Sequence, residues 1–196
     1  MKLNLGGGPN WQRDGWTNLD LAHGYDLGER LLSGFDALSV ERIFCSHSLE
    51  HLPVDRARAL LADCHRVLVK GGIIRLALPD CARFTVAFFE KDMKFFERDT
   101  LKPHFKSARD CFINMGGNPE SFDRPSTIGH YFFYDVPLMV WMLTLAGFSN
   151  LHVSQYGKSE IAEMREIATL DETGMPVAGF DNPLTEAISF YVEAIR

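Results

Sequence analysis

The chain has 196 residues and a formal net charge of −6, and a chain of this length usually forms one domain. Hydrophobic residues make up 46% and charged residues 23%, which is typical of globular proteins and excludes disordered, collagen-like and coiled-coil chains. Because the charge is negative, we expect no nucleic-acid partner. No apolar run approaches the roughly 20 residues of a membrane span, and no signal peptide is recognisable. We therefore expect a cytoplasmic protein with no membrane span.

The first half of the chain alternates apolar runs with a helical pattern. Short apolar runs predict four strands, at 2–5, 16–21, 42–46 and 73–78. Apolar residues at three- and four-residue spacing predict an amphipathic helix over 53–68, with Gly71 and Gly72 as its cap. Strands that alternate with helical segments favour a parallel sheet in an α/β fold.

The second half begins with a segment that breaks this rhythm. Residues 81–130 combine many phenylalanines with many charges, and we interpret them as a mostly helical insertion after the fourth strand. A helix is predicted over 135–145, with Gly147 as its cap, and two further strands at 150–154 and 188–195.

The four cysteines indicate no metal or redox motif. Cys45, Cys64, Cys81 and Cys111 are scattered, and no two of them form a C-x-x-C pair. We interpret all four as reduced thiols in or near the core.

A glycine cluster directly follows the first predicted strand. Gly6, Gly7 and Gly8 would let a ligand approach the backbone closely, although a tight turn without a ligand has the same sequence. Asp20 ends the next strand, where a carboxylate can accept hydrogen bonds from a ribose diol. The cluster lacks the last glycine of the dinucleotide fingerprint G-x-G-x-x-G, which packs the helix against the strand, and no helix is predicted to follow it. The pyrophosphate of a nicotinamide dinucleotide would therefore have no helix N-terminus to bind.

These motifs, taken in order, resemble class I S-adenosylmethionine-dependent methyltransferases. The resemblance rests on residues 3–9, 18–20, 46–52 and 66–80, and it resumes more weakly at 129–130, 135–148 and 190–194. Among these enzymes the chain is most similar to a compact subgroup, methyltransferase type 11-like. The resemblance implies a Rossmann-like sheet that is mostly parallel with an antiparallel last strand, trimmed at the N-terminus, with helices on both faces. Residues 1–196 would form a single methyltransferase domain, with 81–130 as a helical insertion or lid.

The same resemblance implies a set of residues that bind S-adenosyl-L-methionine. Leu5 and the three glycines would line its methionyl and ribose part, and Asp20 would bind the ribose hydroxyls. Leu21 would flank the adenine, whose edge Asp26 and Leu27 would contact. Ser46 and His47 would lie beside the methionine moiety, and His51 would hold the cofactor loop. At residue 4 the family often has an acidic residue that organises the glycine loop, whereas this chain has Asn4.

Two histidines are candidate catalytic bases. His47 shares one face of a helical turn with Glu50 and His51, and His130 precedes an aromatic run. An imidazole can take a proton from an acceptor hydroxyl or amine, but His130 packed among aromatic residues is an equally good interpretation. The order H-x-x-E-H differs from the zinc motif H-E-x-x-H and no further ligand is placed by sequence, so we expect no metal.

The sequence thus predicts a methyltransferase that acts on a hydroxyl or amine of a small-molecule or glycan-like acceptor, with His47 or His130 as general base. Two alternatives stay open, a non-catalytic module that binds S-adenosylmethionine and an NAD(P)-dependent oxidoreductase. The aromatic insertion has three interpretations, a lid over the acceptor, an auxiliary hydrophobic core and a homodimer interface.

Overall fold

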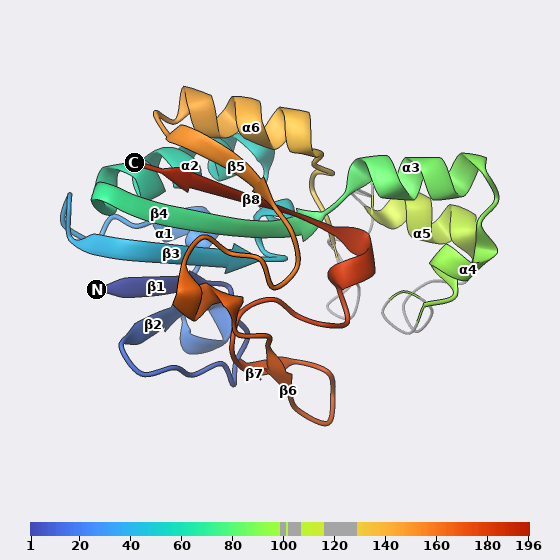
Figure 1. Ribbon diagram of the computed structural model, residues 1–196, viewed down its shortest axis with the longest axis horizontal. Helices are drawn as coiled ribbons and strands as arrows, with labels where there is room; N and C mark the ends of the chain where they lie inside the picture. Colours follow the sequence, from blue (N-terminus) through green and yellow to red (C-terminus); the bar gives the residue numbers. More distant parts are fainter. Residues whose placement is uncertain (99–100, 102–106, 116–128) are drawn as a thin grey trace.

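The structure is a computed structural model that describes residues 1–98, 101, 107–115 and 129–196 (Figure 1). The other residues of the predicted insertion, 99–100, 102–106 and 116–128, lie outside the described part. The strands are β1 (Lys2–Leu5), β2 (Trp16–Leu19), β3 (Val40–Ser46), β4 (Leu68–Pro79), β5 (Ser149–Ser154), β6 (Thr169–Leu170), β7 (Pro176–Ala178) and β8 (Ser189–Ile195). The α-helices are α1 (Leu27–Arg30), α2 (Val54–Val67), α3 (Cys81–Phe89), α4 (Met93–Phe96), α5 (Ala108–Met115) and α6 (Val136–Leu145). Short 3-10 helices are η1 (Leu21–His23), η2 (Leu49–His51), η4 (Ala162–Arg165) and η5 (Glu186–Ile188).

Six strands form the main sheet, in the order β2-β1-β3-β4-β8-β5. The strands β2, β1, β3 and β4 are parallel, whereas β8 runs antiparallel to both of its neighbours, β4 and β5. This confirms the predicted α/β fold with a mostly parallel sheet and an antiparallel last strand. From β1 the chain first adds β2 on one flank and then β3 on the other flank. The strand order therefore reverses between β1 and β3, which makes this position a topological switch point.

One face of the sheet is covered by helices. Alternate residues of the central strands, such as Leu3, Ile74 and Val192, are almost fully buried and pack against α2 and α6. The helix α2 supplies the other side of this core, since its buried residues recur at three- and four-residue spacing: Ala57, Leu60, Leu61, Cys64 and Val67. Leu5 belongs to this same core.

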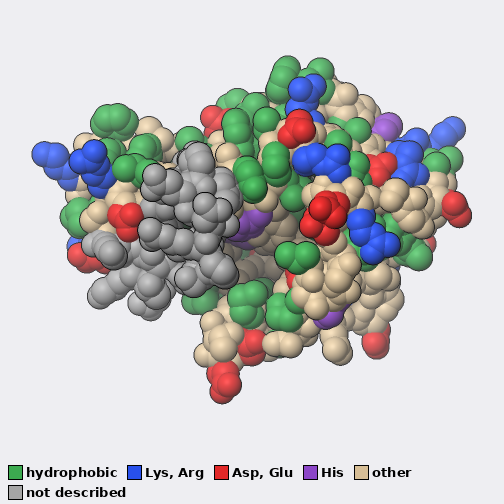
Figure 2. All heavy atoms as spheres, turned by 180° about the vertical axis from the view of Figure 1, so that it is seen from behind, with side chains coloured by type: hydrophobic (Ala, Val, Ile, Leu, Met, Phe, Trp, Pro, Cys, Tyr) green, Lys and Arg blue, Asp and Glu red, His purple; other side chains and the backbone are tan. Residues whose placement is uncertain are grey.

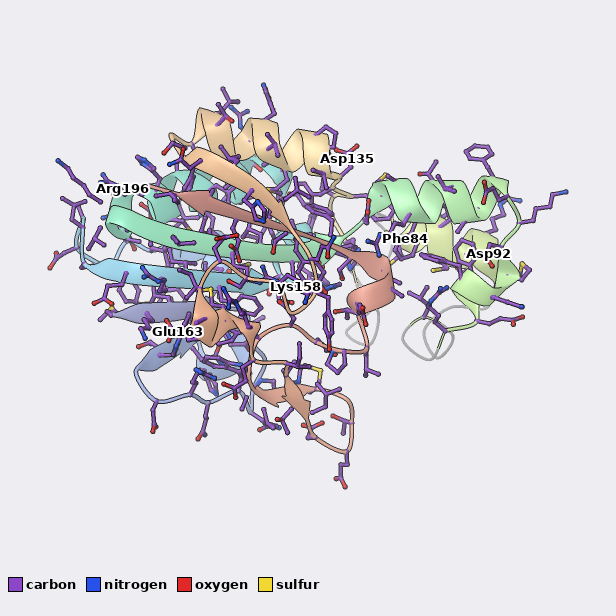
Figure 3. The ribbon with its side chains drawn as sticks, viewed as in Figure 1. Phe84, Asp92, Asp135, Lys158, Glu163 and Arg196 are labelled. Atoms are coloured by element: carbon purple, nitrogen blue, oxygen red, sulfur yellow. The ribbon has the colours of Figure 1, made fainter. Side chains whose placement is uncertain are left out.

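The opposite face carries no full helix in the described residues, so the expectation of helices on both faces is wrong. It is covered instead by the chain between β5 and β8, which contains the short η4 helix and the β6–β7 hairpin (Figure 1). Trp11, Phe44, Met164 and Phe180 form a second core there. Glu163, labelled in Figure 3, forms an ion pair with Lys2 of β1 at 2.7 Å between Oε2 and Nζ.

The insertion builds a core of its own. Helices α3, α4 and α5 lie together beyond the carboxyl end of β4 (Figure 1), and Phe84 is fully buried among Phe95, Phe96 and Phe133. Figure 3 shows Phe84 on α3, at the side of the insertion that faces the sheet. Of the phenylalanines in the insertion, Phe84, Phe95 and Phe96 are therefore part of an auxiliary core, whereas Phe89 is 77% exposed and Phe105 and Phe122 lie outside the described part.

Gly71 and Gly72 do not cap the preceding helix as expected. Helix α2 ends at Val67, where the chain passes directly into β4. The pairing of β3 with β4 shifts register between Leu68 and Ile73, and Gly71 adopts a φ of +76° in this bulge. The glycine pair therefore marks an irregularity inside a strand, which has the same sequence signal as a helix end. Gly147, with a φ of +99°, does follow the end of α6 as predicted.

The four cysteines are free, as expected, and three of them are buried. Within the described residues, no helix combines the length and the apolar character that a membrane span requires.

The covering segment is held by a buried guanidinium on β4. Arg75 is fully buried, and its five N–H groups donate to Ser154, Glu193, the carbonyl of Gln155 and, twice, to Asp181. Asp181 and Glu193 are buried as well, and each also accepts a backbone N–H, from Gly157 and Glu160 respectively. All five donors of the guanidinium are thus satisfied.

We expect Arg75→Met to destabilise the protein by about 3–5 kcal/mol, because it leaves two buried carboxylates without their cation. Chemical denaturation would measure the loss, with Arg58→Met on the exposed face of α2 as the matched control. Adding Asp181→Asn to Arg75→Met should recover part of the loss, since it removes one stranded charge. Equal stability of the Arg75→Met and Arg58→Met variants would contradict this account.

Candidate functional site

A cavity of about 980 Å³ opens at the carboxyl ends of β1, β2 and β3, at the switch point of the sheet. This is where ligands bind in open α/β sheets. Figure 2 shows a hollow near the centre of the molecule with histidine side chains in its wall. The volume lies at the upper end of the range for small-molecule sites, about 300–1,000 Å³.

The glycine loop forms one wall of the cavity and is tightly packed from behind. A Cβ on Gly7 would lie 2.2 Å from Nδ2 of Asn4, and one on Gly6 would lie 2.0 Å from Oγ of Ser48. Asn18 fixes the loop, since its Oδ1 accepts the N–H of Gly7 at 3.2 Å and its Nδ2 donates to the carbonyl of Gly8 at 2.8 Å. Where the family often has an acidic residue that organises the loop, Asn4 packs behind Gly7, and it is Asn18 on β2 that binds the loop backbone.

Asp20 links the glycine loop to the turn after β2. Its two carboxylate oxygens accept backbone N–H groups from Gly8 and Ala22, both at 2.9 Å. Because a carboxylate oxygen has two lone pairs, Asp20 can accept further hydrogen bonds from a ligand in the cavity. It is one of the lining residues.

The adjacent wall is made mostly by apolar side chains. Leu21, Tyr25, Leu27 and Leu52 line the cavity here, and Leu21 is 70% exposed. Asp26 also lines it, but its Oδ1 accepts the backbone N–H groups of Gly28 and Glu29 at the start of α1. The carboxylate of Asp26 is therefore a helix cap as well as a lining group.

His47 lies at the end of β3 in a left-handed backbone conformation, with a φ of +50°. Its Nε2 is 2.7 Å from Oγ of Ser189, whose hydroxyl donates to the carbonyl of Thr185. Ser189 is thus left as an acceptor, so Nε2 carries the proton of His47. Burial and the neighbouring His51 lower the pKa of His47 to about 3, so its ring is neutral at neutral pH.

Glu50, on η2, is a buried carboxylate without a hydrogen-bond partner. It is 1% exposed, and neither of its carboxylate oxygens has a partner. The nearest polar contact is Nδ1 of His47, 3.5 Å from Oε1. Burial raises the pKa of Glu50 to about 8. Such an unpaired buried group is rare and calls for an explanation.

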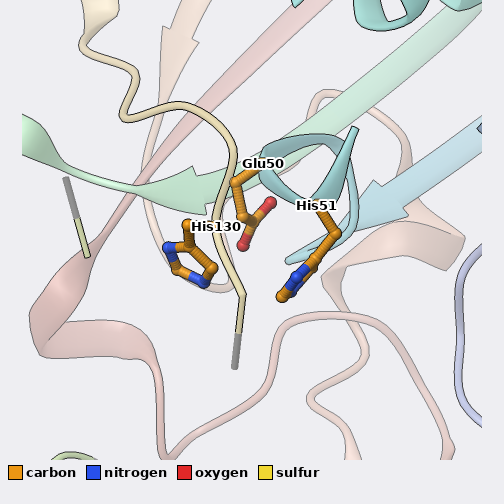
Figure 4. A group of neighbouring side chains, drawn as sticks. All are labelled: Glu50, His51 and His130. Atoms are coloured by element: carbon orange, nitrogen blue, oxygen red, sulfur yellow. The ribbon is translucent and has the colours of Figure 1, made fainter. Parts of the chain in front are cut away.

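His51 and His130 lie next to Glu50 with their rings in edge-to-face contact, at a centroid distance of 4.8 Å. Figure 4 shows the carboxylate of Glu50 between the two rings. His130 is 2% exposed, and burial together with the nearby histidines lowers its pKa to about 3. Burial also lowers the pKa of His51. Each of the three residues offers one ligand atom, and these atoms lie within 4.8 Å of one another, so the group is able to hold a metal ion.

His130 reaches this position through backbone pairing. The N–H of Tyr131 donates to the carbonyl of Glu50 at 2.8 Å, which fixes the segment before α6 against η2. Two parts of the chain separated by about eighty residues thus meet at one point of the cavity wall.

The C-terminal half of the chain contributes a wall that the sequence did not predict. Met175 lies over the glycine loop, 3.2 Å from where a Cβ of Gly8 would be, and Phe180 and Ile188 also line the cavity. The hairpin is attached by hydrogen bonds from Trp11 Nε1 to the carbonyl of Gly179 and from the N–H of Gln12 to the carbonyl of Val177. A turn signal was present, because Asp171 and Gly174 lie between the two short strands, but two- and three-residue strands are too short to show a period.

Most of the predicted site residues lie together at the cavity. The lining includes Gly6, Gly7, Gly8, Asp20, Leu21, Asp26, Leu27, Ser46, His47, His51 and His130. Leu5 is the exception, because its side chain points into the helix-covered core. Of the described residues of the insertion, Leu101, Met115 and His130 reach the cavity, so its wall is shared between the insertion and the segment before β8.

Comparison with known proteins supports the fold. No family model matches the sequence, and the search of curated proteins finds no match. Among solved structures, an S-adenosylmethionine-dependent methyltransferase from Archaeoglobus fulgidus is 13% identical with a TM-score of 0.52, over 100% of this chain and 85% of that one. One from Mesorhizobium loti is 14% identical with a TM-score of 0.52, over 100% of this chain and 90% of that one. The chain has the class I S-adenosylmethionine-dependent methyltransferase fold.

Proposed function

We propose that this protein is an S-adenosylmethionine-dependent methyltransferase that acts on a hydroxyl or amine of a small-molecule or glycan-like acceptor. The observation that carries the proposal is that one cavity at the switch point gathers the glycine loop, Asp20 and the histidine cluster. Location in the cytoplasm and homodimer formation stay predictions from the sequence.

The residues present fit the cofactor. The glycine loop is a surface without side chains that a methionyl and ribose group can approach, Asp20 keeps free lone pairs at the end of β2, and Leu21 and Leu27 offer an apolar seat for adenine. When bound, S-adenosylmethionine supplies an electrophilic methyl group on a positively charged sulfur. The chain's own contribution is to align the acceptor with that methyl group and to keep water out.

Of the two candidate bases, His130 is the better placed. Nε2 of His47 is engaged by Ser189, and its Nδ1 faces Glu50 at 3.5 Å instead of the open cavity, so we assign His47 a positioning role. Nδ1 of His130 is 3.4 Å from the carbonyl of Met115, which assigns the proton to Nδ1 and the lone pair to Nε2. Because its pKa is about 3, His130 is neutral at neutral pH and is a weak base when it acts alone.

The two alternatives differ from this proposal in specific ways. The connection between β1 and β2 is fully described and contains no helix, so the glycine loop offers no helix N-terminus to the pyrophosphate of a nicotinamide dinucleotide. A non-catalytic module would bind the cofactor but would not turn over.

Isothermal calorimetry with S-adenosylmethionine, S-adenosylhomocysteine and NADH tests the cofactor assignment. We expect heat of binding from the first two and none from NADH. Heat from NADH alone would overturn the proposal, and the same holds if none of the three ligands binds.

Removing the carboxylate of Asp20 should weaken cofactor binding. We expect Asp20→Ala to raise the calorimetric Kd for S-adenosylmethionine by about tenfold or more, because hydrogen bonds to a charged group are worth about 1.5–3 kcal/mol. The exposed Asp36→Ala is the matched control. Thermal unfolding would show that both variants are folded, and an unchanged Kd for Asp20→Ala would refute the role given to this residue.

Removing the imidazole of His130 should affect turnover more than binding. We expect His130→Ala to lower kcat by about a hundredfold or more, with little change in the Kd for S-adenosylmethionine. Formation of S-adenosylhomocysteine, followed over a panel of small hydroxyl and amine compounds, gives the rate. His152→Ala, on exposed β5 and paired with Glu160, is the control. A His130→Ala enzyme with full kcat would remove His130 from the reaction.

A further inference from the structure

We propose that Glu50, His51 and His130 bind one divalent transition-metal ion at the acceptor end of the cavity. Each residue offers a ligand atom, these atoms lie within 4.8 Å of one another, and all three residues line the cavity. In Figure 4 the carboxylate and the two rings converge on one point. Three protein ligands that leave positions open to a cavity are typical of catalytic metal sites.

The first support is the unpartnered carboxylate. Among the acidic side chains of the cavity wall, the carboxylates of Asp20 and Asp26 each accept two backbone N–H groups, whereas neither carboxylate oxygen of Glu50 has a hydrogen-bond partner in the described structure. Without a partner, the buried carboxyl group of Glu50 keeps its proton, because a charge in such a place is normally paired or bound to a metal. A bound cation is the partner that Glu50 lacks.

The second support is the orientation of both histidines. Nδ1 of His51 is 2.9 Å from the carbonyl of Gly129, and Nδ1 of His130 is 3.4 Å from the carbonyl of Met115. In each case the carbonyl must accept a proton from Nδ1, so Nε2 keeps the lone pair that a metal needs. Ligand histidines in metal sites are oriented by carbonyls or carboxylates in the same way. Two rings that independently show this arrangement, on opposite sides of one carboxylate, are not explained by packing alone.

The donor atoms indicate the kind of metal. Two imidazole nitrogens and one carboxylate suit Zn²⁺, Fe²⁺, Co²⁺ or Mn²⁺, whereas Mg²⁺ and Ca²⁺ prefer oxygen ligands only. The inference departs from the expectation of no metal, which rested on the order of His47, Glu50 and His51. The third ligand is His130 instead of His47, and it comes from a segment about eighty residues away.

The role of the ion rests on the proposed function. A cation here would hold an acceptor oxygen in the cavity and would lower the pKa of an acceptor hydroxyl, so that its proton is released to solvent water before the methyl group is transferred. The lone pair of His130 then binds the metal and takes no proton. Loss of turnover in His130→Ala fits both roles, so the test must measure metal binding directly.

The experiment uses tag-free protein that has been stripped with a chelator, without S-adenosylmethionine or acceptor. Titration with Co²⁺ is followed by calorimetry and by the visible d–d absorption of the bound ion. We expect one ion per chain. Glu50→Gln and His130→Ala should each weaken its binding by at least about tenfold, since changes to residues that merely contact a metal ligand already cost that much. His152→Ala and Glu160→Gln, exposed and away from the cavity, are the matched controls and should bind Co²⁺ like the original protein.

Circular dichroism shows whether each variant is folded. If His130→Ala does not fold, Glu50→Gln still tests the site, because it keeps the size of the side chain. The inference is overturned if the folded protein binds no Co²⁺, or if Glu50→Gln binds it as tightly as the original protein. Failure of this inference is distinct from failure of the proposed function. A protein that binds S-adenosylmethionine but no Co²⁺ loses only the metal site, and one that binds Co²⁺ but no S-adenosylmethionine loses only the methyltransferase assignment.

Discussion

The arrangement of the cavity depends on one buried guanidinium. Arg75 lies in the middle of β4, on the face of the sheet that no full helix covers in the described residues, and it binds both ends of the segment that replaces such helices. Because Asp181 follows Phe180 directly, the ion pair that anchors the segment also places Phe180 in the cavity wall. A polar network that satisfies all of its donors can fix a loop as firmly as a packed helix does.

The two faces of the sheet are therefore covered through different kinds of interaction. The helix-covered face is held by alternating apolar residues, such as Leu3 and Ile74, whose burial is non-directional. The opposite face has the smaller core around Phe180 and adds directional contacts, the Arg75 network and the ion pair between Lys2 and Glu163. Directional contacts specify where a long irregular segment lies, and this segment supplies a large part of the cavity roof.

Within the cavity, the acidic residues divide into two kinds. Asp20 and Asp26 stabilise the backbone, and their carboxylates hold the glycine loop and the start of α1. The carboxylate of Glu50 accepts no hydrogen bond in the described structure, and it lies beside two histidines, His51 and His130, that are themselves fixed through Nδ1. The carboxylates near the glycine loop hold the backbone, whereas the carboxylate at the histidine cluster has no hydrogen-bond partner among the described residues. This difference fits a cofactor bound at the glycine loop and chemistry at the histidine cluster.

The sequence by itself determined the fold class, the strands from β1 to β4 and the position of α6, and the family resemblance pointed to most of the residues that line the cavity. The strands and the helix follow from periodicity, and the place of the cavity follows from the rule that the ends of parallel strands meet, which are local or topological properties. It could not show that Leu5 points into the core instead of the cavity, that Gly71 lies in a bulge, or that Asn18 clamps the glycine loop. Only the tertiary structure brought His130 to Glu50 and the segment before β8 over the cavity. The physical reason is that these contacts join residues about eighty or more positions apart through hydrogen bonds and ion pairs, which leave no periodic trace in the sequence.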